Sequence, residues 1–166
     1  MIPSSSVLDQ STIATLLTID PLVQQYRTFF ALLDWSFVDH WQAARSPRGR
    51  PAHPESAYLK AFFIRQHQQF SYTSQLRQFL VQHPLLIIEL GFHLILDPSA
   101  AYGFDIERTL PTRFWFSHKL RTFDPALLQD FLHATVTALQ AEIPGLGETV
   151  AFDVKHIFAW VPRKQR

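Results

Sequence analysis

The chain has 166 residues, 47% of them hydrophobic and 17% charged, and a formal net charge of +1 at pH 7. This composition is typical of a folded protein with a hydrophobic core and excludes a disordered chain. Cysteine is absent, which excludes disulfides and thiolate metal sites, and the sequence has no secretory signal and no apolar run long enough to span a membrane, so we expect a soluble cytoplasmic protein without a membrane partner.

Helix-capping residues and prolines divide the first third of the chain into predicted helices. We expect a first helix over residues 7–18. Asp20 followed by Pro21 combines a capping side chain with proline at the first helical position, and it predicts that a second helix begins there. Ser36 can cap a short third helix, after which residues 45–51 form a basic connector rich in proline and glycine.

Two further helices are predicted to form a hairpin. The first runs from Pro54 to about Phe70, a polar break over residues 71–73 follows, and Ser74 begins the second helix. Two helices joined by such a short turn resemble a helix-turn-helix, although any helical hairpin shows this pattern. In a helix-turn-helix the second helix would present three side chains outward as candidate DNA contacts: Gln75, Arg77 and Gln78.

The pattern remains helical over the following residues. Residues 85–90 form a short apolar helix that Gly91 closes, and residues 92–110 are expected to be irregular. One more helix follows, and Asp124-Pro125 then opens the last one, which should stop near Ile143. The apolar residues of this last helix at helical spacing are Leu127, Leu128, Phe131, Leu132, Val136 and Leu139.

The end of the chain has a different pattern. Its apolar residues, with Val150, Phe152 and Val154 in alternation, predict a strand or short β-hairpin, and Asp153 lies in the middle of it. We therefore expect a mainly α, multi-helix domain over residues 1–146 and the first strands of a second fold over residues 147–166. The alternative is a lone strand with an ordinary surface Asp.

Charges of one sign are grouped along the sequence. Basic side chains dominate residues 45–77, and every charged residue from 108 to 121 is basic. Such blocks create basic faces on a nearly neutral protein and favour contact with a polyanion, although solvated helix faces show the same pattern. The candidate contacts to DNA phosphates are Arg45, Arg48, Arg50, Lys60, Arg113, Lys119 and Arg121.

Several short motifs occur in an order that resembles a known family. They are, in chain order, Gly49-Arg50-Pro51-Ala52-His53-Pro54, Leu59-Lys60-Ala61, the Leu-Arg-x-Phe-Leu segment from Leu76 to Leu80, Leu110-Pro111-Thr112, and Val150-Ala151-Phe152-Asp153. Over residues 45–158 the chain resembles the N-terminal domain of bacterial insertion-sequence DDE transposases of the IS4/IS5 type, together with the first strand of their catalytic domain.

The resemblance implies an enzyme of DNA transposition with an RNase H-like core. In that family two Asp and one Glu bind two Mg²⁺ ions, which activate the attacking oxygen and stabilise the leaving oxygen of a phosphodiester displacement. The resemblance implies that Asp153 is the first catalytic residue and metal ligand. It also implies that the helical domain binds DNA at the terminal repeats of an insertion element.

The sequence departs from the family after Asp153, because no carboxylate follows it. A single carboxylate cannot hold two Mg²⁺ ions. We therefore expect a truncated transposase fragment that binds DNA, binds no metal by itself and is catalytically incomplete. The alternative is a helical interaction module that self-associates, as a homodimer for example, and has no DNA role.

Overall fold

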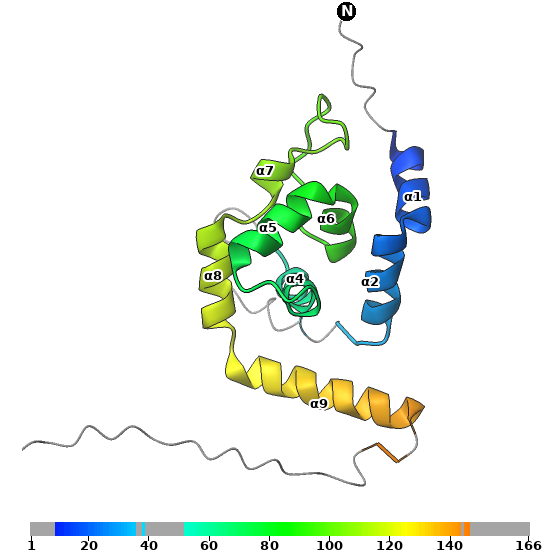
Figure 1. Ribbon diagram of the computed structural model, residues 1–166, viewed down its shortest axis with the longest axis vertical. Helices are drawn as coiled ribbons and strands as arrows, with labels where there is room; N and C mark the ends of the chain where they lie inside the picture. Colours follow the sequence, from blue (N-terminus) through cyan, green and yellow to red (C-terminus); the bar gives the residue numbers. More distant parts are fainter. Residues whose placement is uncertain (1–8, 36–37, 39–51, 144, 147–166) are drawn as a thin grey trace, which may run out of the picture.

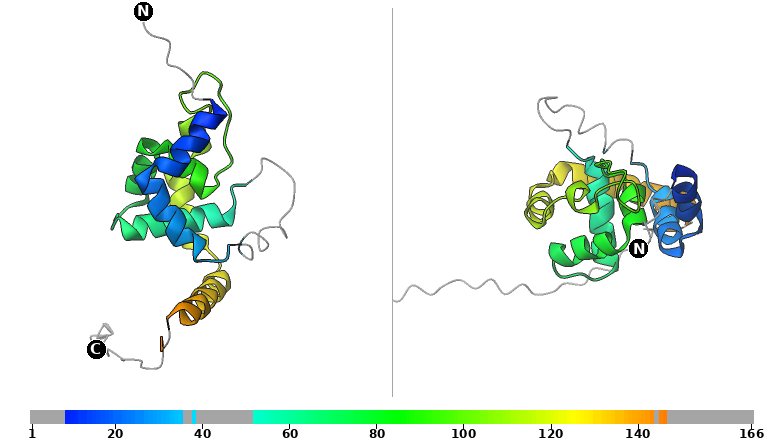
Figure 2. Two further views of the ribbon diagram at one scale, coloured as in Figure 1. Left: turned by 90° about the vertical axis from the view of Figure 1, so that its right-hand side faces the viewer. Right: turned by 90° about the horizontal axis from the view of Figure 1, so that it is seen from above.

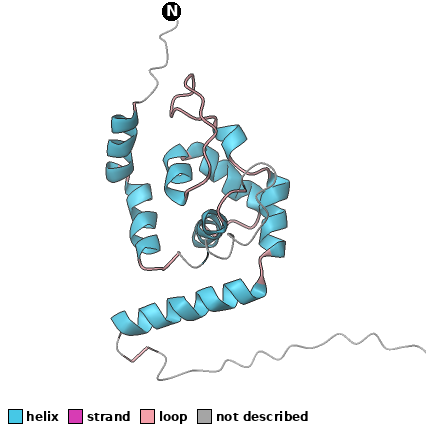
Figure 3. Cartoon of the chain, turned by 180° about the vertical axis from the view of Figure 1, so that it is seen from behind, coloured by secondary structure: helices cyan, strands magenta, loops and turns pink. Residues whose placement is uncertain are grey.

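The computed structural model describes residues 9–35, 38, 52–143 and 145–146 (Figure 1). This part of the chain is mainly helical and contains no strand (Figure 3). Its helices are α1 (Gln10–Ile19), α2 (Pro21–Ala31), α4 (Glu55–His67), α5 (Thr73–Gln82), α6 (Pro84–Leu90), α7 (Ile106–Thr109), α8 (Arg113–Thr122) and α9 (Pro125–Glu142). The predicted short helix after Ser36, the connector over 45–51 and the strand around Asp153 lie largely or wholly outside the described residues.

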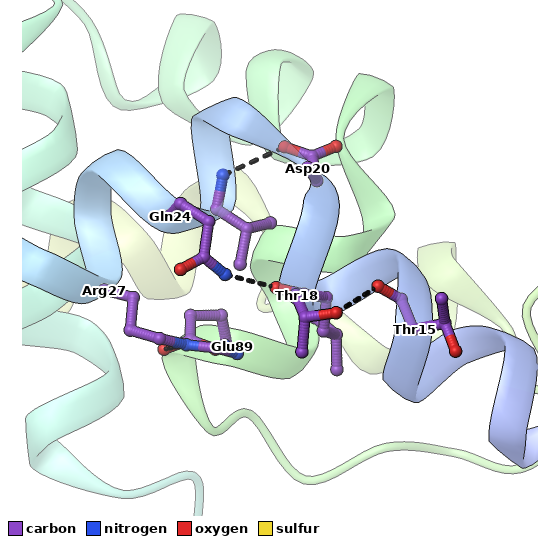
Figure 4. A network of polar contacts seen from close by, with 8 residues as sticks. Thr15, Thr18, Asp20, Gln24, Arg27 and Glu89 are labelled. Atoms are coloured by element: carbon purple, nitrogen blue, oxygen red, sulfur yellow. Dashed lines mark hydrogen bonds and ion pairs between the residues drawn. The ribbon is translucent and has the colours of Figure 1, made fainter.

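The first two helices confirm the prediction made from Asp20 and Pro21. The Asp20 carboxylate accepts hydrogen bonds from the backbone N–H groups of Leu22 and Val23, both at 2.9 Å, and Pro21 occupies the first turn of α2. Figure 4 shows this corner, where the Gln24 side chain also donates to a backbone carbonyl of α1. These bonds satisfy the backbone donors that a helix start leaves unpaired, and they fix the angle between α1 and α2.

An ion pair attaches the N-terminal helices to the rest of the protein. Arg27 of α2 donates to both carboxylate oxygens of Glu89 on α6, with Nη2 2.5 Å from Oε2 (Figure 4). Helices α1 and α2 both pack against α6. The bidentate geometry gives the contact a defined orientation.

Helix α4 lies in the middle of the fold, with α5, α6 and α8 packed against it (Figures 1 and 2). Ala57, Ala61 and Ile64 are fully buried on its inner face, and small alanine side chains let the neighbouring helices approach closely. Phe104 and Phe116 are among the largest fully buried side chains of the core. The heavy aromatic content of the sequence is therefore used partly in packing.

The turn between α4 and α5 begins earlier than the sequence predicts. Helix α4 ends at His67 because Gln69 has a left-handed backbone conformation, with φ 55°, and the N–H of Phe70 bonds back to the Arg65 carbonyl at 2.9 Å. This bond pattern closes a helix and reverses the chain. Helices α4 and α5 are therefore packed as a hairpin, whereas a DNA-reading role for α5 remains a prediction.

Residues 92–110 are mostly irregular, as predicted, but they include the short helix α7. The Asp105 carboxylate caps it by accepting from the N–H of Arg108 at 3.0 Å. An isolated antiparallel bridge joins Leu96 to Phe104. The sequence pattern does not show α7, because a single turn has too few residues for an apolar periodicity.

We expect Gly91→Ala to lower the free energy of unfolding by about 1 kcal/mol. Gly91 ends α6 with φ +84°, a conformation that L-residues adopt only with strain, and an added Cβ would meet no atom within 4 Å. The cost is therefore conformational and not steric. Gly91→Asn should lose less, because Asn tolerates this conformation better than Ala. Urea unfolding of the three proteins gives the comparison, and equal losses for Ala and Asn would contradict it.

Helix α9 stops at Glu142, as predicted, and Gly145 beyond it has φ +82°. Its apolar residues divide between two faces. Leu127 and Phe131 are buried in a small cluster with Val38 and Leu59, whereas Leu128, Leu132 and Val136 are exposed and Leu139 is half-buried. Helix α9 thus lies across one end of the helical cluster, and among the described residues its buried contacts come from its first turns (Figures 1 and 3).

Candidate nucleic-acid interface

An open groove of about 640 Å³ lies where the end of α4, the turn into α5 and helix α8 come together. Three arginines and several hydroxyl groups line it, and none of its lining residues in the described part of the chain is a carboxylate. The lining residues are Arg65, Ser71, Tyr72, Thr73, Ser74, Arg113, Ser117, Leu120 and Arg121. A groove with only cationic and hydroxyl side chains among its polar groups has the composition of a phosphate-binding surface.

Helix α8 places two of the arginines on one side. The Thr112 hydroxyl caps α8 by accepting from the N–H of Trp115 at 3.3 Å, so that Arg113 is the first helical residue. Arg113, Ser117 and Arg121 follow at intervals of four residues, which brings all three onto one face of the helix. Arg121 Nε donates to the Ser117 carbonyl at 3.3 Å and stays exposed.

The start of α5 forms the opposite wall of the groove. The Thr73 and Ser117 hydroxyls share a hydrogen bond of 2.7 Å, which joins α5 to α8. The Tyr72 N–H donates to the Gln75 side-chain oxygen at 2.9 Å and completes the cap of α5. The positive end of the α5 dipole thus faces the same groove as the arginines.

The third arginine, Arg65, was not among the DNA contacts predicted from the sequence. It lies near the end of α4, and its Nη2 donates to the carbonyl of Ser71 at 2.7 Å. This bond holds the guanidinium beside the turn that leads into α5. The sequence shows Arg65 within a basic block, but only the hairpin brings it next to Arg113 and Arg121.

The three side chains predicted on α5 have different environments. Gln75 and Gln78 are exposed, although Gln75 is engaged in the cap just described. The expectation that Arg77 points outward is wrong, because its side chain is only 18% exposed. Arg77 forms an ion pair with Glu107 at 2.5 Å and donates to the Pro111 carbonyl at 3.1 Å, so it joins α5 to the segment before α8.

Lys119 does not join Arg113 and Arg121 in the groove. It forms an ion pair with Glu55 of α4, is 16% exposed, and lies 5.4 Å from the centre of the Tyr58 ring. Lys119 is two residues from both Ser117 and Arg121, about 200° around the helix, and therefore lies on the opposite face. Its ammonium connects α8 to α4 within the protein.

The other predicted residues lie away from the groove or outside the described residues. Lys60 is half-buried, with its ammonium 5.0 Å from the centre of the Trp35 ring. The remaining members of the predicted set lie in the connector or in the final segment, outside the described residues: Arg45, Arg48, Arg50 and Asp153.

Tyr58 is a buried tyrosine that should ionise only at high pH. Burial, with a smaller contribution from the Glu55 carboxylate, raises the pKa of Tyr58 from 10.0 to about 12. Because the pKa is raised in the folded state, the neutral phenol contributes stability that is fully present below pH 10 and is lost as the pH rises through about 12. Ultraviolet absorbance measures the ionisation of the phenol, and parallel circular dichroism measures the loss of folded structure.

The control for this titration is Tyr58→Phe, which should remove an absorbance step near pH 12. An identical step near pH 12 in Tyr58→Phe and in the wild type would contradict the assignment.

Two other kinds of site are absent from the described residues. No group of three or more His, Asp or Glu side chains in this part of the chain is arranged to hold a metal ion. No helix within it has the length and apolar character needed to cross a membrane.

The chain matches no model of a known protein family, no curated protein and no solved structure. The resemblance to transposases thus rests on the order of the short motifs in the sequence. The groove is an independent observation, since its arginines come from the folded arrangement and Arg65 belongs to none of those motifs.

Proposed function

We propose that this chain is the DNA-binding part of an insertion-sequence transposase and that the arginine groove between α4, α5 and α8 holds the phosphate backbone of the element's terminal DNA. The observation that carries the proposal is the convergence of Arg65, Arg113 and Arg121 on one groove that no carboxylate of the described residues lines. The order of the transposase-like motifs supports the family part of the proposal, and the groove supports the DNA-binding part.

The groove suits a phosphodiester backbone for a specific reason. Guanidinium groups donate planar, paired hydrogen bonds to phosphate oxygens, and hydroxyl groups such as those of Ser71 and Ser74 add further donors. The N–H groups at the start of α5 provide partial positive charge at the same place. Contacts of this kind set affinity and orientation on DNA, and they carry little sequence information.

The proposed activity is binding and not strand transfer. Strand transfer would need the two metal ions that the resemblance implies, and Asp153 is the residue of this chain that would contribute to holding them. The proposal for this chain is therefore limited to DNA binding, with Asp153 as the residue that would contribute to a metal site.

The test is a titration of the purified chain against duplex DNA from the ends of an insertion element and against unrelated duplex DNA, each at low and at moderate salt. We expect binding at low salt to both, with a steep loss of affinity as salt rises, because phosphate contacts release counterions. Absence of binding at low salt would contradict the proposal.

Self-association is the second candidate function, and the exposed stripe of α9 favours it. Leu128, Leu132 and Val136 of α9 and Ile143 just after it are exposed and recur every three or four residues with Leu139, whereas Leu127 and Phe131 of the first turns pack on the domain. A narrow apolar stripe of this kind is typical of a helix that packs against a second helix. The occupant we infer is α9 of a second copy.

Light scattering tests the second candidate. A concentration-dependent dimer that Leu132→Glu abolishes would support it. Leu132 is exposed, so this change should leave the circular dichroism of the domain unchanged. A monomer at all concentrations would contradict the second candidate and would leave the DNA-binding proposal unaffected.

A further inference from the structure

Helix α8, which lines the arginine groove, also carries an exposed cluster of aromatic rings. The side chains of Phe114 and Trp115 are 64% and 50% exposed. The Phe114 and His118 rings are nearly parallel, with centroids 5.8 Å apart and an interplanar angle of 9°. The Trp115 ring meets His118 edge-on at 5.3 Å. The three rings therefore form one surface and support one another.

The cluster is contiguous with the cationic face of α8. Phe114, His118 and Arg121 are spaced at i, i+4 and i+7, which places them along one side of the helix. Tyr72, which is 70% exposed, lines the same groove from the start of α5. An aromatic ring therefore lies among the groove residues on α5, and the ring cluster of α8 adjoins the arginine face of that helix through Phe114.

The core packing of α8 uses a different aromatic side chain. The packing of α8 against α4 is provided by Phe116, which is fully buried and in edge-on contact with Phe62 and Tyr58. Phe114 and Trp115 are exposed instead, and neither belongs to the hydrophobic core clusters of the described residues. Exposed aromatic clusters of this kind mark binding surfaces.

The neighbouring charge identifies the class of ligand. Proteins that hold single-stranded nucleic acid combine cationic groups that follow the backbone with aromatic rings on which the bases stack. In duplex DNA the base faces are already stacked and cannot reach such rings. An arginine groove next to exposed rings is therefore complementary to a strand whose bases are unpaired.

We propose that this face binds a nucleic-acid strand with unpaired bases, in which the phosphates occupy the arginine groove and one or two bases stack on Phe114 and Trp115. The inference rests on the proposed DNA-binding function and deepens it, because it names the form of DNA that the surface prefers. A DNA end with an opened terminal base pair offers both features.

The experiment compares two probes with the purified chain: a fluorescently labelled oligothymidine of about 12 nucleotides, a length within the range of single-stranded binding sites, and a blunt duplex of the same length. Phe114→Ala combined with Trp115→Ala should weaken oligothymidine binding about tenfold and duplex binding less than twofold. Arg113→Ala combined with Arg121→Ala should weaken binding of both probes.

Matched controls separate stacking from folding. Trp115→Phe keeps an aromatic face and should retain oligothymidine affinity, and circular dichroism should show that every variant keeps the helical content of the wild type. Equal loss of affinity for the two probes in the double alanine variant, or no loss for either, would overturn the stacking proposal. Failure of the wild type to bind either probe would instead overturn the proposed function itself.

Discussion

We expect Glu55→Ala to lower the free energy of unfolding by about 3 kcal/mol. The Glu55 carboxylate accepts from the Lys119 ammonium between α4 and α8, and both side chains are largely buried. Removing the carboxylate leaves the Lys119 charge in a mostly dry environment without its ion-pair partner, and an uncompensated buried charge is costly. Glu55 is also in the first turn of α4, where a negative charge stabilises the helix.

The measurement is chemical denaturation followed by far-ultraviolet circular dichroism. Glu142→Ala is the matched control, because Glu142 is an exposed acidic residue at the end of α9, and its loss should change the free energy of unfolding by no more than about 0.5 kcal/mol. Equal stability of the Glu55 and Glu142 variants would show that the Lys119 charge is solvated in the folded protein. Lys119 would then regain its place among the candidate DNA contacts.

The largest expected effect on binding comes from replacing Arg65, Arg113 and Arg121 together by Ala. If each guanidinium contributes about 1 kcal/mol through a charge-assisted contact, the triple variant should bind duplex DNA about 100-fold more weakly at low salt. The loss should be similar for any duplex sequence, because phosphate contacts do not distinguish bases. Fluorescence anisotropy measures it.

Stability and binding can be separated in this variant. Arg113 and Arg121 are exposed and form no ion pair among the described residues, so their loss should leave the fold intact. Arg65 donates to the Ser71 carbonyl, so the double variant of Arg113 and Arg121 provides a second comparison with the wild type if the triple variant is less stable. Unchanged affinity in a folded double variant would exclude the groove as the DNA contact.

The elements that could be predicted from the sequence are those set by local chemistry. Asp20-Pro21 and Asp124-Pro125 each begin a helix in the structure, because the cap and the proline act within a few residues. Gly91 ends α6 with a positive φ for the same reason. Such features depend on neighbours in the chain and need no knowledge of the rest of the fold.

The candidate site depended on tertiary structure and was predicted only in part. Arg113 and Arg121 share a face by helical spacing, and that spacing also shows that Lys119 lies opposite them. In contrast, Arg65 reaches the groove only through the α4–α5 hairpin. Arg77 is held inward by Glu107, an acidic residue that lies 30 positions away in the sequence. Long-range partners of this kind leave no pattern in the local sequence.

The environments of the apolar residues of α9 could likewise be predicted only in part from the sequence. Their spacing indicates an amphipathic helix, yet the structure divides them between a short buried contact and a longer exposed stripe. Which part of an apolar face meets the core is decided by where the neighbouring helices end. That information is in the packing of α4 and Val38, not in α9 itself.

The proposal that the arginine groove binds DNA phosphates is tested most directly by the salt dependence of DNA binding in a matched pair of variants, Arg121→Ala and Arg108→Ala. Arg108 is exposed and cationic like Arg121 but lies outside the groove. We predict that Arg121→Ala lowers the slope of log affinity against log salt by about 0.9, the value for one lost phosphate contact, while Arg108→Ala leaves the wild-type slope unchanged. Equal slopes in the two variants would contradict the assignment of the groove as the phosphate-binding surface.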